Sequence, residues 1–274
     1  MSEEDSIKKT AAPVTASSIV RDLRALGVTP GVTVLVHSSL SAMGWVAGGV
    51  HAVVLALEEA MGPGGTLVMP SHSGHLTDPA SWVNPPVPAA WFETIREETP
   101  PFDPALTPTR DMGAVVDCFR SQPGVLRSNQ PRDSFCARGP HAEAIVTGHS
   151  LAFGLGENSP LARLYDLDAH VLLLGVGHES NTSLHLAEYR AEWPGKKLIA
   201  QGAPVVIDGE RRWERFQDVD LDADDFEALG TDFERDTDSV RFGRVGLASS
   251  RLMAQRAAVD YAVSWIPAHR PSKR

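Results

Sequence analysis

VLLLGVGHESNTSLHLAEYRAEW, residues 171–193, contains the sharpest change of structural pattern in the chain. Its apolar run, 171–174, predicts a buried strand, and the turn Gly175-Val176-Gly177 ends that strand. A helical pattern follows, for which Asn181 or Thr182 is the expected N-cap. A strand that passes through a glycine turn into a helix is a common way to build a site at the carboxyl end of a strand.

Two polar side chains share one face of this helix. His185 and Glu188 are three residues apart, so their side chains leave the helix on the same side. An imidazole can take a proton from an attacking amine near neutral pH, and a carboxylate one turn along can fix its tautomer. His178 adds a second imidazole in the turn. The alternative interpretation is a His–Glu pair on a solvated helix face.

The N-terminal part of the chain repeats the strand–loop–helix order. Residues 32–36 predict a β-branched strand that runs into His37-Ser38-Ser39, and residues 50–61 predict a helix. TLVMP, residues 66–70, predicts a second strand, which also ends in polar residues that include His72. Two strands joined by a helix form a βαβ unit and pair in parallel, so Ser38 and His72 are expected at the same edge of the sheet.

The remainder of the chain is more varied. The proline-rich segment 78–108 predicts a long ordered loop with a short helix near 91–97, and loops of this length are usually functional or disordered. Asp208-Gly209 predicts a β-hairpin, and residues 249–265 predict a final amphipathic helix. The expected fold is α/β: three α/β/α layers with a mixed, largely parallel central sheet and a small β-rich C-terminal portion.

One domain is expected from residue 14 to residue 274, with a hairpin and acidic insertion at 190–245. Residues 1–13 are polar, lack an apolar signal core and predict a flexible tail. No run approaches the ~18 apolar residues of a membrane span, so we expect a cytoplasmic protein with no membrane partner. Cys118 and Cys136 are expected to be reduced packing residues.

The net charge of −10 argues against a nucleic-acid partner, which needs a basic surface. Between Asp208 and Asp238 thirteen Asp and Glu stand against four Arg. A solvated acidic loop explains such a cluster most simply. A negative wall for a substrate with several ammonium groups is the functional alternative.

Several other chemistries are weaker on motif grounds. The chain has no dinucleotide fingerprint, no Walker lysine and no GxSxG elbow. A serine hydrolase that uses Ser38 or Ser39 with His185 has no oxyanion hole assigned to it. A metal-dependent hydrolase would need ligands from His72, His75, His178, His185 and Glu188, but H-x-x-E spacing is weaker than H-E-x-x-H, so we expect no metal.

Five motifs in order carry a resemblance to a known family: LVHSSLSAMGWVAGG, GPGGTLVMPS, SNQPRDSF-x-A-x-GPHA, SPLARL and VLLLGVGHESNTSLHLAEYR. Together they resemble the aminoglycoside 3-N-acetyltransferases, which differ in fold from the GNAT acetyltransferases. The resemblance covers residues 14–266. It implies transfer of acetyl from acetyl-CoA to the 3-amine of the deoxystreptamine ring, which confers resistance to the antibiotic.

The resemblance also assigns site residues. His185 matches the family's general base and Glu188 the acid that follows it. The resemblance implies that His37, Ser38 and Ser39 lie beside the pantetheine and thioester. It places Gly175, Val176, Gly177, Ser134 and Phe135 on the same acetyl-CoA side. Asp78, His178, Asp218 and Asp220 are the corresponding candidates for the antibiotic pocket.

One departure from the family pattern is Gln130, which stands before Pro131 where many relatives have His. Gln donates hydrogen bonds but carries no charge, so it has no expected role in proton transfer. Backbone amides near Ser38-Ser39 or Gly175 are candidates for stabilising the oxyanion. The expected partners are an aminoglycoside and acetyl-CoA, and the expected assembly is a monomer or homodimer.

Three alternatives remain open on the sequence. The enzyme could acetylate another amine, such as a biosynthetic intermediate in an antibiotic producer. A metal-dependent hydrolase and a non-catalytic aminoglycoside-binding module are the other two. Metal analysis separates the hydrolase from a transferase, and a binding module would bind without release of CoA thiol.

Overall fold

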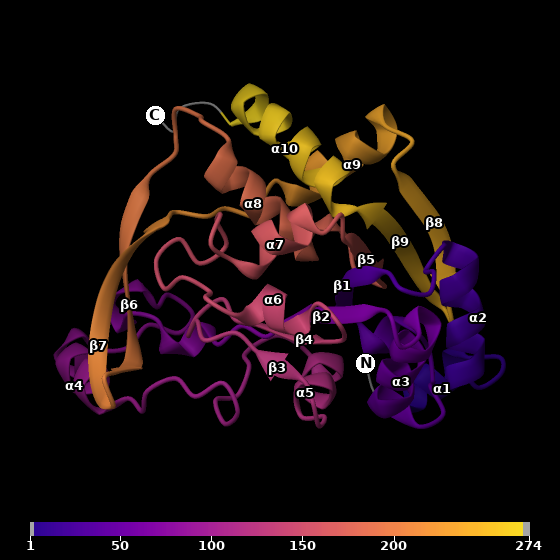
Figure 1. The fold of residues 1–274 in the computed structure, drawn as a ribbon, viewed down its shortest axis with the longest axis horizontal. Helices are drawn as coiled ribbons and strands as arrows, with labels where there is room; N and C mark the ends of the chain where they lie inside the picture. Colours follow the sequence, from indigo (N-terminus) through magenta and orange to yellow (C-terminus); the bar gives the residue numbers. More distant parts are fainter. Residues whose placement is uncertain (1–2, 271–274) are drawn as a thin grey trace.

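The protein is organised around a seven-stranded mixed sheet, as seen in a computed structural model that describes residues 3–270 (Figure 1). The strand order is β3-β4-β2-β1-β5-β9-β8. A separate two-stranded sheet consists of β6 and β7. The strands are β1 Thr33–Ser38, β2 Thr66–Pro70, β3 Leu126–Arg127, β4 Phe135–Arg138, β5 His170–Leu174, β6 Leu198–Ile207, β7 Glu210–Val219, β8 Val240–Val245 and β9 Ala248–Ala254.

The α/β class, the mixed sheet and the β-rich C-terminal portion are confirmed. The sheet was expected to be largely parallel, but parallel pairing is limited to the three central strands, β2, β1 and β5. The outer neighbours β4, β3, β9 and β8 all pair antiparallel. In the β1–β5 register Ser38 lies opposite Leu174, so the strand ends that carry the two polar segments meet at one edge.

Helices cover both faces of the sheet, which gives the expected three layers (Figure 1). Val34 and Val36 of β1 face the core with α2, α3 and α5, while Leu35 faces the core with α6, α7, α8, α9 and α10. This alternation follows from the two-residue repeat of a strand. The helices are α1 Glu3–Lys9, α2 Ala16–Leu26, α3 Gly49–Met61, α4 Phe92–Glu98, α5 Ala114–Arg120, α6 Ala142–Val146, α7 Pro160–Asp166, α8 Ser183–Arg190, α9 Phe226–Asp236 and α10 Gln255–His269.

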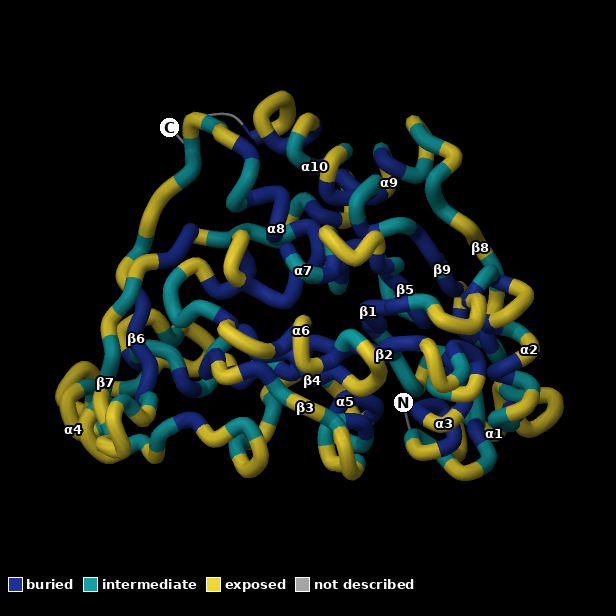
Figure 2. The backbone as a smooth tube through the Cα atoms, in the orientation of Figure 1, coloured by how far each residue is buried: buried dark blue, intermediate teal, exposed yellow. Residues whose placement is uncertain are grey.

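The β6–β7 sheet lies at one end of the molecule beside α4 (Figure 1). Arg211 of β7 donates to the carbonyl of Thr99 just after α4, and the amide of Phe102 donates to the carbonyl of Pro204 in β6. Figure 2 shows the central strands buried and the exposed backbone gathered at the periphery, including α4. The proline-rich segment is therefore tied to the hairpin.

Local sequence features account for several elements. Thr15 caps α2 in a capping box, and Gly27 ends that helix at φ 113°. Asp208 and Gly209 have φ values of 53° and 79°, as a tight hairpin turn requires. Both cysteines are free, and Cys136 is fully buried.

Other predictions need correction. The final helix was expected at 249–265, but Ala248–Ala254 is strand β9 and the helix begins at Gln255. The acidic segment contains the amphipathic helix α9, whose Phe226 and Phe233 are buried. Residues 3–9 form helix α1, in which no residue is buried. No helix within residues 3–270 has the length and apolar character to cross a membrane.

Candidate active site

The His185–Glu188 pair lies on α8, directly after β5 and its turn. The Nδ1 atom of His185 is 2.5 Å from Oε2 of Glu188. Glu188 is fully buried, whereas 18% of the His185 side chain remains exposed. The ring of His185 packs against Phe226, with 4.8 Å between the ring centroids. Because the carboxylate is buried and the imidazole is half-buried, this pair does not lie on a solvated helix face.

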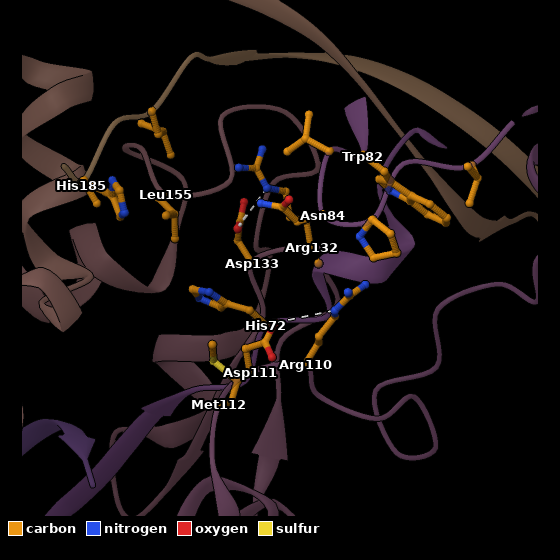
Figure 3. A pocket seen from close by; sticks show the side chains of 16 residues that line it. His72, Trp82, Asn84, Arg110, Asp111, Met112, Arg132, Asp133, Leu155 and His185 are labelled. Atoms are coloured by element: carbon orange, nitrogen blue, oxygen red, sulfur yellow. Dashed lines mark ion pairs between the residues drawn. The ribbon is translucent and has the colours of Figure 1, made fainter. Parts of the chain in front are cut away.

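His185 lines a cavity of about 730 Å³. Figure 3 shows His185 on one side of this cavity and Trp82 on the other, with His72 between them at its floor. The cavity has the size of a small-molecule site, for which 300–1,000 Å³ is typical. Its lining residues are His72, Gly74, Trp82, Val83, Asn84, Pro85, Val87, Arg110, Asp111, Met112, Arg132, Asp133, Leu155, His185, Leu221 and Ala223.

Two further histidines lie close to His185. His37 is at the end of β1, and His72 follows β2. Burial, reinforced by the neighbouring imidazoles His72 and His185, lowers the pKa of His37 to about 3. Burial also lowers the pKa of His72 to about 4, against the opposing effect of Asp133. Both rings are therefore neutral at pH 7, and the Nε2 atom of each is buried without a hydrogen-bond partner.

Two charged pairs line the cavity. Asp133 is nearly buried and lies 3.5 Å from Nε of Arg132, and its Oδ2 atom has no hydrogen-bond partner (Figure 3). Asp111 lies 3.6 Å from Nε of Arg110, with 89% of its side chain exposed. Asp111 also has a φ of 61°, a conformation that costs a non-glycine residue about 1 kcal/mol or more and that clusters at functional sites.

The residues expected beside acetyl-CoA fall into two groups. Ser38 and Ser39 are half-buried where β1 ends next to β5. Ser134 and Phe135 are fully buried. The hydroxyl of Ser134 donates to the carbonyl of Ser71 and accepts from Arg127, so this serine joins β4 to the loop after β2 rather than facing the cavity.

The glycine turn packs closely against its neighbours, and its amides have partners. Gly175, Val176 and Gly177 are half-buried, and Gly175 has a φ of 72° with Ala42 and Ala248 packed where a Cβ would lie. The amides considered for the oxyanion are already engaged. Those of Ser39 and Gly175 donate to backbone carbonyls. Those of Gly177 and His178 donate to the carboxylates of Glu179 and Glu227.

His178 does not line the cavity that His185 lines. It is buried, with Nε2 2.9 Å from Oε1 of Glu234, and its ring packs against Gly230 of α9. The close approach requires glycine, because a Cβ at residue 230 would overlap the imidazole. The contacts of His178 therefore join the turn to α9.

The three acids expected to hold the antibiotic also lie outside the cavity lining. Asp78 binds Arg96 through both carboxylate oxygens and caps the amide of Ala80. Asp218 is fully buried; it accepts from the hydroxyl of Tyr189, and burial raises its pKa. Asp220 is exposed, and its amide donates to the carbonyl of Lys197.

Sequence reasoning missed the acids that do line the cavity, Asp111 and Asp133. The signals for them were indirect: Asp133 stands within the quoted motif SNQPRDSF, and the 78–108 segment, which contributes Trp82, Val83, Asn84, Pro85 and Val87, ends three residues before Asp111. Gln130 is buried, accepting from the amide of Asp133 and donating to the carbonyl of Leu151. It therefore shapes the loop that carries Asp133.

No group of three or more His, Cys, Asp and Glu side chains is arranged to hold a metal ion in residues 3–270. The five residues considered as ligands of a metal-dependent hydrolase do not all lie at one place. His178 contacts Glu234 near α9, and His185 contacts Glu188 at the cavity.

Comparison with known proteins gives matches over nearly the whole chain. The aminoglycoside 3-N-acetyltransferase family profile matches residues 35–267. The SPbeta prophage-derived aminoglycoside N(3')-acetyltransferase-like protein YokD of Bacillus subtilis (strain 168) is 46% identical over 94% of this chain and 94% of its own. Aminoglycoside N(3)-acetyltransferase VIII of Streptomyces fradiae is 38% identical over 97% of this chain and 96% of its own.

Solved structures agree. The crystal structure of YokD has a TM-score of 0.94 at 45% identity, over 97% of this chain and 98% of that one. AAC-IIIb, solved as a binary complex with CoASH, has a TM-score of 0.84 at 32% identity, over 96% and 99%. AAC-VIa bound to sisomicin has a TM-score of 0.84 at 33% identity, over 94% and 98%.

Proposed function

The chain belongs to the aminoglycoside 3-N-acetyltransferase family, and we propose that it transfers the acetyl group of acetyl-CoA to the 3-amine of a deoxystreptamine aminoglycoside. Acetyl transfer to aminoglycosides follows from the family. The observation that carries the mechanism is the buried Glu188 carboxylate behind His185 at the wall of the cavity. Relatives solved with CoASH and with sisomicin support the two substrates.

His185 is the general base of this proposal. Its Nδ1–H donates to Glu188, which leaves Nε2 as the atom that accepts a proton. The substrate amine attacks the thioester carbonyl, and its proton passes to Nε2. The C–S bond then breaks, and the thiolate leaves as CoA-SH after it takes up a proton. Glu188 stabilises the imidazolium that forms between these steps.

The cavity suits a polycationic amine. Asp111 and Asp133 place carboxylates on its wall, and Trp82 offers an aromatic surface. A net charge of −10 raises the local concentration of cations around the molecule. We therefore assign ammonium recognition to Asp111 and Asp133 instead of the expected Asp78, Asp218 and Asp220.

A thiol-release assay tests the proposal. The protein is mixed with acetyl-CoA and a panel of deoxystreptamine aminoglycosides, and the product of any active pair is mapped by NMR. We expect release of CoA thiol together with an acetyl group on the 3-nitrogen. An aminoglycoside built on streptidine, which lacks that ring, is the matched negative control. Absence of thiol release across the panel would overturn the proposal in favour of a different amine.

A further inference from the structure

Arg270 reaches from the end of α10 to the buried side of the His185–Glu188 pair. Its Nη1 atom donates to Oε1 of Glu188 at 2.6 Å. Its Nε and Nη2 atoms hold both carboxylate oxygens of Asp225 at 2.7 and 2.6 Å. Nη2 also donates to the carbonyl of Asp222 at 2.6 Å. Only 10% of the Arg270 side chain is exposed, so these contacts form away from solvent.

The guanidinium lies close to two aromatic rings. Its Cζ atom is 5.4 Å from the ring centre of Trp193 and 5.9 Å from that of Phe226. Phe226 is the same ring that packs against His185. A planar guanidinium suits both contacts, because it stacks on rings while its fork binds carboxylates. The base and the arginine thus share one packing partner as well as one carboxylate.

Glu188 has a partner on each oxygen. Oε2 contacts His185, and Oε1 accepts from Arg270 and from the amide of Asp222. A fully buried carboxylate is costly unless it is paired and hydrogen-bonded. Among these partners Arg270 supplies a permanent positive charge, since hydrogen bonds to Asp225 and Glu188 raise its pKa despite the opposing effect of burial.

Arg270 also fixes part of the cavity wall. Leu221 and Ala223 line the cavity, and the carbonyl of Asp222 between them accepts from Arg270. Asp225, two residues further on, is held by the same guanidinium. One side chain therefore connects the proposed base dyad to the loop 221–225.

We propose that Arg270 is a positioning residue for acetyl transfer, which holds the Glu188 carboxylate in its orientation behind His185 and fixes loop 221–225 against the substrate cavity. The inference rests on the proposed role of His185 as general base. Arg270 itself reaches no cavity-lining position, so it acts only through Glu188 and the loop.

The charges around the dyad determine how loss of Arg270 would affect the base. The flanking imidazoles of His37 and His72 are neutral at pH 7, and Asp225 lies on the far side of the guanidinium. Without Arg270, no positive charge would offset the negative charge of Glu188, which would then attract a proton on His185 more strongly. Asp225 would also lose its positive partner and add to the negative charge near His185. The protonated, inactive form of the dyad would gain stability. The acid limb of the pH profile of kcat should then move to higher pH.

The test compares Arg270→Met and Arg270→Lys with Arg256→Met as the matched control. Arg256 lies in α10, which Arg270 directly follows; it pairs with Asp168 at 2.7 Å and donates to the carbonyl of Tyr165 at 2.9 Å, but its contacts lie away from the cavity. We expect Arg270→Met to move the acid limb up by about one pH unit. At pH values below the limb, kcat should then fall about tenfold. Arg270→Lys should restore the limb, and Arg256→Met should leave it unchanged.

A folded Arg270→Met variant with the wild-type kcat and pH profile would overturn the inference. If that variant does not stay folded, Asp225→Asn takes its place, because it weakens one anchor of loop 221–225 and leaves the guanidinium on Glu188. A raised KM for the aminoglycoside is expected in Asp225→Asn, and a KM equal to that of the wild-type protein would overturn the inference. Activity in His185→Ala would instead show that the proposed base is wrong, whatever Arg270 does.

Discussion

At the scale of single residues, the site is built from groups whose charge is set by burial. His37 and His72 are held neutral close to His185, so they add no positive charge that would oppose formation of an imidazolium. Glu188 on the other side favours that imidazolium. His185 therefore has a carboxylate partner, whereas the Nε2 atoms of the two neighbouring imidazoles have no hydrogen-bond partner.

Asp111 provides the first prediction. Its carboxylate is exposed at the cavity and its backbone has a φ of 61°, which Asn also tolerates. Asp111→Asn should therefore keep the fold but raise the KM for the aminoglycoside, with little change in kcat and a weaker dependence on salt. Asp103→Asn is the control, since Asp103 lies outside the cavity lining. Equal KM values for both variants in steady-state kinetics would remove Asp111 from substrate binding.

At the scale of elements, the segment between β2 and α5 forms one side of the cavity. Asp78 and Arg96 brace it through an ion pair whose side chains are 18% and 17% exposed. Trp82 reaches back to the hydroxyl of Thr77. These contacts explain how a proline-rich loop can present Trp82 and Asn84 in fixed positions.

The second prediction separates bracing from direct binding at Asp78. If Asp78 braces the loop, Asp78→Asn and Arg96→Met should raise the KM for the aminoglycoside alike, by about fivefold for ~1 kcal/mol of lost loop order. Steady-state kinetics on both variants measures this. A rise in Asp78→Asn alone, with Arg96→Met unchanged or binding more tightly, would indicate that Asp78 contacts the antibiotic.

Local patterns predicted the elements that carry His37, His185 and Glu188, because the apolar repeat of a strand or helix and the residues that end it lie within a few residues of each other. They failed where two elements abut without a break, as where β9 passes directly into α10 at Gln255. They also failed for contacts set by register and packing. Arg270 meets Glu188 across 82 residues of chain, and no local pattern relates the two.

At the scale of the whole molecule, buried neutral histidines couple stability to pH. Burial lowers the pKa of His37 to about 3 and those of His72 and His149 to about 4, whereas each titrates near 6.5 when unfolded. The unfolded chain therefore binds more protons between those values. The stability that these neutral histidines contribute is present above pH 6.5 and is lost as the pH falls below it.

The third prediction concerns the size of this loss. Lowering the pH from 7.5 to 5 should cost about 2 kcal/mol of unfolding free energy per histidine. Urea denaturation at each pH measures the loss. His149→Asn should reduce the pH dependence of the unfolding free energy by the contribution of one histidine. The variant suits this test because His149 is buried between Ser128 and Gly154, away from the cavity lining. An unfolding free energy that is constant over this range would contradict the assignment of these rings as neutral.

The most direct test of His185 as the general base is the kcat of His185→Ala with acetyl-CoA and an aminoglycoside that the wild-type protein acetylates. Loss of the base should lower kcat by about 10²–10⁴-fold, while the KM of each substrate changes little. Circular dichroism on the same samples checks that the variant is folded. Turnover close to the wild-type value in the folded variant would contradict the assignment of His185 as the base.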